Sequence, residues 1–226
     1  MKKYILLLLC TSLFAGPPMH SNDPFVPSLG EFEINIAWSG ESRDETLQRA
    51  PIVDLNYGII ENVQVTLESA YVHTDIADDI DSFELALKWN FYTGSVFAIA
   101  LYPQYVSYPI ESIFGHGDDY ELSIPVSIAI DENIDLVVDT TYVIPFEGEN
   151  HFEFGSYLKY SMQKHTYFAE IFLEEEGNSL EFFTLGSLGY MYQFHEHIAF
   201  MISYGVELTT KSTKVTSGYT GLQFVF

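Results

Sequence analysis

The sequence contains little cysteine and little positive charge. Its one cysteine is Cys10, so the disulfide frameworks of small secreted domains are excluded. Nine Lys and Arg stand against 32 Asp and Glu, which gives a formal net charge of −23. A chain this acidic cannot neutralise phosphates, and we exclude nucleic acid as a partner. No run approaches the roughly 18 uninterrupted apolar residues that a transmembrane helix needs.

Twelve segments alternate apolar and polar residues with period two. Side chains of a β-strand point alternately to opposite faces, so each segment predicts a strand with one apolar face. The clearest is Phe83–Phe91, where Phe, Leu, Leu, Trp and Phe alternate with Glu, Ala, Lys and Asn. Strict alternation over segments of about ten residues is typical of membrane β-barrels. The expected strands are 31–39, 52–59, 63–73, 82–91, 96–107, 120–130, 134–144, 151–160, 166–174, 180–192, 198–208 and 217–226.

The connections between these segments alternate in length. The short ones are 60–62, 92–95, 131–133, 162–165 and 193–196, and the long ones are 40–49, 74–81, 108–119, 145–150, 175–178 and 209–215. Outer-membrane barrels have short periplasmic turns and longer outer loops. The sequence therefore predicts an all-β fold over residues 31–226, a closed antiparallel transmembrane β-barrel of about 12 strands in an up-and-down meander.

The last strand ends on an aromatic residue. In residues 217–226 the apolar side chains Leu222, Phe224 and Phe226 share one face. A barrel in lipid must pair its last strand with its first, because an open edge would leave backbone groups without partners. This ending resembles the C-terminal signal of bacterial outer-membrane barrels. The resemblance implies localisation in the outer membrane and recognition by the barrel-assembly machinery.

The first 30 residues predict an export signal and an irregular segment. A positive start, an apolar core and small residues at the end predict a secretory signal peptide over residues 1–16. Cys10 offers lipidation as an alternative, but such sites prefer a small residue where Leu9 stands. Residues 17–30 are rich in proline and polar side chains and should be irregular. They either trail in the periplasm or tuck into the lumen as a small plug.

Two hairpins resemble a family of outer-membrane transporters labelled as belonging to the MetA pathway of phenol degradation. In Ala50–Ser69 a strand ending in Asn-Tyr-Gly is followed by a short turn and a strand of alternating Gln and Leu. Phe83–Phe91, followed by Ala100–Tyr105, resembles the family's next hairpin. The resemblance covers the layout of residues 30–226. It implies a channel or transporter for small solutes.

The predicted inward faces are strongly acidic. In a narrow lumen many carboxylates cannot all stay ionised unless water or cations screen them. Either the lumen is wet and attracts cations, or the acids pair with lysines and tyrosine hydroxyls in a packed polar interior. The residues expected to line the lumen are Glu68, Glu84, Lys88, Glu121, Asp135, Asp139, Glu153 and Lys159.

Metal and catalytic chemistry has weaker support in the sequence. We expect no cofactor, with a loop Ca²⁺ as the alternative. One acidic loop offers hard oxygen ligands suited to Ca²⁺, although the glycine and spacing of an EF-hand are absent. These ligands are Asp75, Asp78, Asp79 and Asp81. His195 and His197 form an incomplete shell for a transition metal. No His is placed to act as the base for a serine nucleophile, and we expect no enzymatic activity.

Two functions remain open. The first is a channel or transporter that passes small solutes across the outer membrane, with a preference for cations or neutral solutes because Asp and Glu rings disfavour anions. The second is a non-conducting barrel whose acidic loops bind a surface partner or divalent cations. The expected partners are outer-membrane lipid and small solutes.

Overall fold

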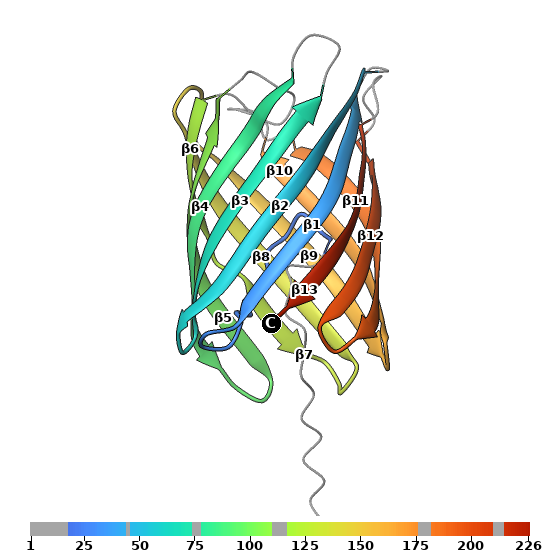
Figure 1. Cartoon of the computed structure of the whole chain (residues 1–226). Helices are drawn as coiled ribbons and strands as arrows, with labels where there is room; N and C mark the ends of the chain where they lie inside the picture. Colours follow the sequence, from blue (N-terminus) through green and yellow to red (C-terminus); the bar gives the residue numbers. More distant parts are fainter. Residues whose placement is uncertain (1–17, 44–45, 74–77, 110–116, 176–181, 210–214) are drawn as a thin grey trace, which may run out of the picture.

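The computed structural model describes residues 18–43, 46–73, 78–109, 117–175, 182–209 and 215–226 (Figure 1). Its strands are β1 (Phe32–Arg43), β2 (Thr46–Ile60), β3 (Val63–His73), β4 (Asp78–Thr93), β5 (Phe97–Tyr108), β6 (Gly117–Ser123), β7 (Val126–Ala129), β8 (Ile134–Pro145), β9 (His151–Met162), β10 (His165–Glu175), β11 (Phe182–His195), β12 (Ile198–Glu207) and β13 (Thr216–Val225). Among these residues no helix is long and apolar enough to cross a membrane.

The strands form one closed antiparallel barrel. Each strand pairs with its neighbours in sequence, except that β6 and β7 pair with β5 and β8 and not with each other. β1 pairs with β13 to close the sheet. The seam continues to the last residue, because the backbone amides of Phe32 and Phe226 each donate to the other residue's carbonyl at 2.9 Å. Closure leaves no open edge, as lipid requires. The predicted fold is confirmed.

Strands β6 and β7 are two halves of one barrel strand, which brings the number of barrel strands to twelve. Both halves lie between β5 and β8. Pro125 has no N–H to donate and interrupts the ladder between them. Its carbonyl still accepts from the Ala100 amide at 3.1 Å. The prediction of a single unbroken strand over 120–130 was wrong in this detail.

The two ends of the barrel differ as predicted. At one end tight turns of two to four residues connect the strands, as between β2 and β3 and between β9 and β10. The strands reach further than expected at the other end. The predicted connection 40–49 is mostly strand, because β1 continues to Arg43 and β2 begins at Thr46. Likewise β4 begins at Asp78, inside the predicted acidic loop.

The outer face of the barrel is apolar. Leu67, Leu85 and Tyr105 lie directly opposite one another on β3, β4 and β5, and Leu85 is 47 % exposed. Aromatic pairs lie near both ends of the strands. Trp89 with Phe91 and Tyr92 with Phe97 flank a tight turn, whereas Tyr105 with Tyr120 and Tyr142 with Phe152 lie towards the other end. An apolar band between two aromatic girdles is the outer surface of a membrane barrel.

Candidate functional site

Residues 18–30, which we call the plug, run inside the barrel to its short-turn end, where residues 28–30 are exposed before the chain turns into β1 (Figure 1). Glu170 of β10 holds one end of the plug. Its carboxylate accepts hydrogen bonds from the His20 amide at 3.2 Å, the Ser21 amide at 2.9 Å and the Ser21 hydroxyl at 2.6 Å. Of the two placements predicted for this irregular segment, the structure has the one in the lumen.

Asp139 of β8 binds the next residue of the plug. It accepts from the Asn22 amide at 2.9 Å and from the Asn22 side-chain nitrogen at 3.2 Å. The Ser123 hydroxyl donates to the other carboxylate oxygen at 2.5 Å and fixes its orientation. Asp139 is 4 % exposed, so this predicted lumen residue contacts the plug and is closed off from solvent.

The middle of the plug contacts β4. Lys88 lies 3.9 Å from the Asp23 carboxylate, and both side chains are buried. The Asn90 side chain donates to the Pro24 carbonyl at 2.7 Å. Asp23 belongs to the plug and to no strand; burial raises the pKa of its carboxyl, and the charge of Lys88 opposes that rise. A buried carboxylate needs such a partner to remain charged.

Two inward-facing glycines make room for the plug. A Cβ at Gly155 of β9 would overlap the Ser21 side chain, and a Cβ at Gly58 of β2 would overlap the Ser28 carbonyl. Backbone bonds join the same region, since the Gly30 amide donates to the Gly58 carbonyl at 2.8 Å. Close approach of another segment is one reason for glycine inside a strand. The plug is therefore fitted to this barrel by backbone as well as side-chain contacts.

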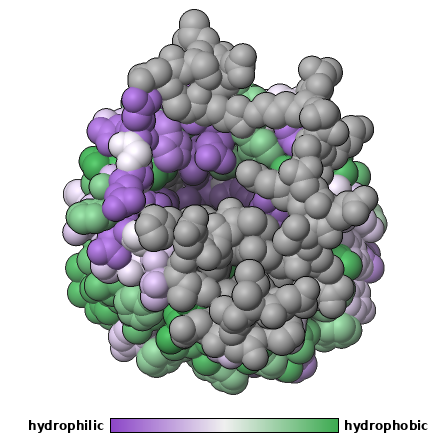
Figure 2. Space-filling model, turned by 90° about the horizontal axis from the view of Figure 1, so that it is seen from above, coloured by the Kyte–Doolittle hydropathy of each residue, from purple (hydrophilic) through white to green (hydrophobic). Residues whose placement is uncertain are grey.

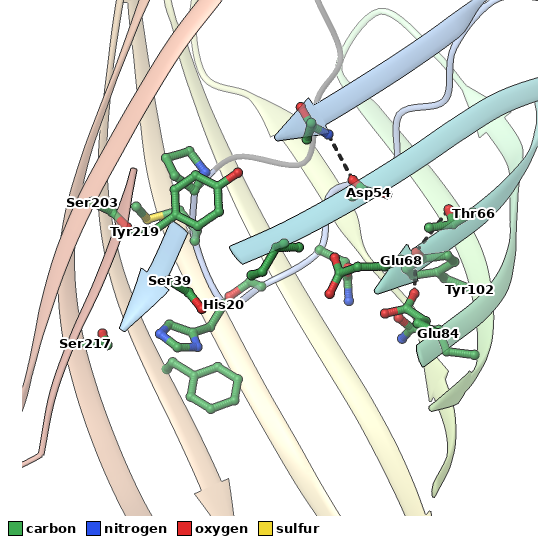
Figure 3. Close-up of a pocket in the computed structure, with 18 of the residues that line it drawn as sticks. His20, Ser39, Asp54, Thr66, Glu68, Glu84, Tyr102, Ser203, Ser217 and Tyr219 are labelled. Atoms are coloured by element: carbon green, nitrogen blue, oxygen red, sulfur yellow. Dashed lines mark hydrogen bonds between the residues drawn. The ribbon is translucent and has the colours of Figure 1, made fainter. Parts of the chain in front are cut away.

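A cavity of about 640 Å³ lies between the plug and the long-connection end of the barrel. Viewed from that end, hydrophilic residues line the visible part of a hollow (Figure 2). His20 and other plug residues line one part of the cavity. Figure 3 shows Asp54, Glu68 and Glu84 together on one side of it and Ser203 and Tyr219 on another.

Three carboxylates form a row on the cavity wall. Asp54 of β2 lies directly opposite Glu68 of β3, which lies directly opposite Glu84 of β4. Directly opposite side chains on neighbouring strands are in contact range, and like charges there repel. We call these three residues the acidic row. Among the side chains that the structure describes, which do not include those of Arg43 and Arg49, no Lys or Arg nitrogen lies within 4.0 Å of the row's carboxylate oxygens. Lys88 instead contacts Asp23 and the ring of Tyr102.

Polar neighbours hold the acidic row in place. The side-chain nitrogens of Asn35 and Asn56 donate to one oxygen of Asp54 at 2.9 and 2.8 Å. The Tyr102 hydroxyl donates to Glu84 at 3.1 Å. Within the described part of the chain, the second oxygen of Asp54 and the side-chain oxygen of Asn35 accept no hydrogen bond. Both of these oxygens are closed off from solvent. The three side chains of the row are only partly buried and line the cavity, so their remaining carboxylate oxygens could bind a cation or a donor group of a solute.

The other predicted lumen residues are spread over the barrel. Glu121 accepts from Gln104 at 3.3 Å, and Lys159 lies 3.7 Å from Asp135. Glu153 lies 3.9 Å from the Nε2 atom of His151. The predicted loop metal ligands cannot be placed: Asp75 and the side chains of Asp78, Asp79 and Asp81 lie outside the described residues.

Sequence reasoning missed the residues that hold the plug. In the expected strands 151–160 and 166–174, alternation puts Gly155 and Glu170 on the inward face, but it gives no sign that both contact residues 20–22. The signal that was available is an inward glycine in the middle of a long regular strand, which often marks close approach by another segment.

No protein family description and no curated protein matches the sequence. Similar folds occur among solved structures. The KdgM porin has a TM-score of 0.63 at 12 % identity, over 85 % of this chain and 99 % of the porin. The COG4313 outer membrane channel from Pseudomonas putida F1 has a TM-score of 0.65 at 10 % identity, over 90 % and 98 %. The translocator domain of autotransporter NalP from Neisseria meningitidis has a TM-score of 0.57 at 14 % identity, over 88 % and 90 %.

At these identities the likeness concerns the fold. Together with the apolar outer face, it places the protein in the bacterial outer membrane, in contact with its lipid. The resemblance of two hairpins to the MetA-pathway family stays a prediction.

Proposed function

We propose that this barrel is an outer-membrane channel for small cationic or neutral solutes and that its plug closes the lumen at rest. The acidic row beside the plug carries this proposal. Solutes enter the cavity from the long-connection end, which is the outer end in barrels of this kind. Passage then requires the plug to leave its contacts with Glu170 and Asp139.

The negative charge of the barrel favours the passage of cations over that of anions. Rings of Asp and Glu in a pore favour cations, and the formal charge of −23 raises the local cation concentration around the whole protein. Among the similar barrels, the KdgM porin was solved with disordered oligogalacturonate, a chain of acidic sugars. An anion of that kind would be repelled by Asp54, Glu68 and Glu84, so we expect a different solute here.

The proposal includes two further predictions from the sequence. The first is membership of the MetA-pathway family, which would imply a role in transport. The second is recognition of the alternating last strand by the barrel-assembly machinery. We propose no enzymatic activity and no cofactor that takes part in transport, and the loop Ca²⁺ site stays a prediction.

The acidic row should set ion selectivity in a barrel whose plug has been released. In the Glu170→Ala background, replacing the row by Asp54→Asn, Glu68→Gln and Glu84→Gln should move the reversal potential in a KCl gradient most of the way to zero. The cation preference of the parent should fade near 1 M salt, where the Debye length is only about 3 Å. The measurement is single-channel recording in a planar bilayer.

The matched control removes three carboxylates from exposed short turns by Glu61→Gln, Glu132→Gln and Glu196→Gln. It should leave the reversal potential unchanged. Anion selectivity in the parent, or equal loss in both triple variants, would contradict the role of the acidic row. A parent barrel that conducts no ions at all would favour the second function, a non-conducting barrel that binds a partner at its surface.

A further inference from the structure

Three potential metal ligands converge at the long-connection end of the lumen. His151 and Glu153 are alternate residues of β9 and share its inward face. Glu174 of β10 lies directly opposite Glu153. One ligand atom from each of the three side chains lies within 4.8 Å of the other two. Glu174 also lines the cavity, so the cluster stands beside the path that a solute would take.

The orientation of His151 suits metal binding. Its Nδ1 atom lies 3.3 Å from the backbone carbonyl of Glu149, and its Nε2 atom lies 3.9 Å from a carboxylate oxygen of Glu153. A carbonyl beside Nδ1 favours the tautomer with the proton on that nitrogen, which leaves the lone pair on Nε2. Metal-bound histidines commonly donate their other ring N–H to a carbonyl or carboxylate in this way.

The electrostatics of the cluster also call for a cation. Glu153 and Glu174 occupy directly opposite positions on neighbouring strands, where like charges are destabilising. The cluster is partly shielded from water, since the His151 side chain is 19 % exposed. A protonated His151 would bring one positive charge to two carboxylates. A divalent ion would balance both and leave the imidazole neutral.

We infer that His151, Glu153 and Glu174 form a site for a divalent transition metal of the Zn²⁺ class. Imidazole nitrogen together with carboxylate oxygen suits Zn²⁺, Ni²⁺ or Co²⁺, whereas Ca²⁺ and Mg²⁺ prefer oxygen ligands alone. Three protein ligands leave a fourth position open for water or for a donor atom of a solute. The site is independent of the proposed channel function.

The chain offers a matched control in His195 and His197. Their ring centroids lie 5.7 Å apart, and the pair belongs to a turn at the opposite end of the barrel. The carboxylate beside them, Glu196, contacts His197 at 3.6 Å, where both side chains are more than half exposed. This turn contains the same residue types without a cross-strand carboxylate.

The test is Zn²⁺ titration of the full barrel in detergent micelles, by calorimetry and by metal analysis after dialysis. We expect one Zn²⁺ per barrel. His151→Ala and Glu174→Gln should each weaken binding at least tenfold, whereas the double variant His195→Ala, His197→Ala should bind like wild type. Heat-modifiable migration on gels checks that each variant is folded, and Glu153→Gln provides a second ligand variant if His151→Ala fails to fold.

Three results would overturn the inference. If wild type binds no Zn²⁺, the cluster is an ion pair of protonated His151 with the two glutamates. If Zn²⁺ binding survives the loss of His151 and of Glu174, the metal lies elsewhere on the chain. If Zn²⁺ binding is lost only with His195 and His197, the metal belongs to the turn.

Discussion

A Glu170→Ala barrel should conduct ions under conditions in which the wild-type barrel stays closed. Glu170 accepts three hydrogen bonds from His20 and Ser21, and no other carboxylate of the described strands accepts as many from the plug. Hydrogen bonds to charged groups contribute roughly 1.5–3 kcal/mol each, partly replaced by water when the plug leaves. A net loss of about 2 kcal/mol shifts the closed-to-open equilibrium about 30-fold. Single-channel recording should show that increase as open time.

Steric expulsion of the plug offers an independent route to the same result. In Gly155→Ala the new methyl group would occupy the position of the Ser21 side chain. The Gly218→Ala control also adds a methyl group to a barrel strand, on the face that Leu222 shares, and the nearest atom to it is the Ser203 carbonyl oxygen at 3.9 Å, an ordinary contact. We expect openings in the first variant and none in the second. Deletion of residues 18–27 should give the largest and steadiest current.

Conductance that is equally low in Glu170→Ala, Gly155→Ala and the deletion variant would contradict the plug model. Such a result would mean that something other than residues 18–30 closes the lumen, or that the barrel does not conduct. Open wild-type channels with the same conductance as the deletion would mean that the plug leaves a path beside it.

The strands themselves could be predicted because lipid and lumen impose opposite demands on alternate residues. The predicted segment 63–73 begins and ends at the same residues as β3, because every second side chain there meets lipid. The rule loses its force where a strand leaves the hydrocarbon layer, because both of its faces then meet water. For this reason side-chain alternation predicts loops at 40–43 and 78–81, although the backbone continues as strand there. Side-chain alternation also does not show that Pro125, which has no N–H to donate, interrupts the ladder between β6 and β7.

The candidate site was only partly predictable. Alternation puts Glu68 and Glu84 on the inward face, but their direct opposition depends on the register between β3 and β4. Register follows from turn geometry and from the bulge between Ala70 and Tyr71, neither of which the composition of the strands reveals. Residues 18–30 show no regular alternation of apolar and polar side chains, so their sequence alone does not decide between a position in the periplasm and one in the lumen.

A charged residue on the lipid-facing wall should strongly destabilise the barrel. Leu85→Arg should lower the free energy of unfolding by roughly 2–4 kcal/mol, the cost of an Arg on the lipid face near the bilayer midplane. Leu85 is 47 % exposed on the outer wall, and its cross-strand neighbours Leu67 and Tyr105 offer no carboxylate to pair with a guanidinium. Urea unfolding in lipid vesicles, followed by the fluorescence of Trp38 and Trp89, measures the loss.

The same new side chain on the inner wall provides the control. Gln104 lies one residue along β5 from Tyr105 and faces the lumen, where its side chain donates to Glu121 at 3.3 Å. An Arg at this position meets carboxylates and water, so Gln104→Arg should leave stability nearly unchanged. Lumen substitutions tune selectivity, whereas charges on the lipid face destabilise. Equal losses at Leu85 and Gln104 would mean that the apolar wall does not face lipid, and the membrane orientation of this barrel would then be wrong.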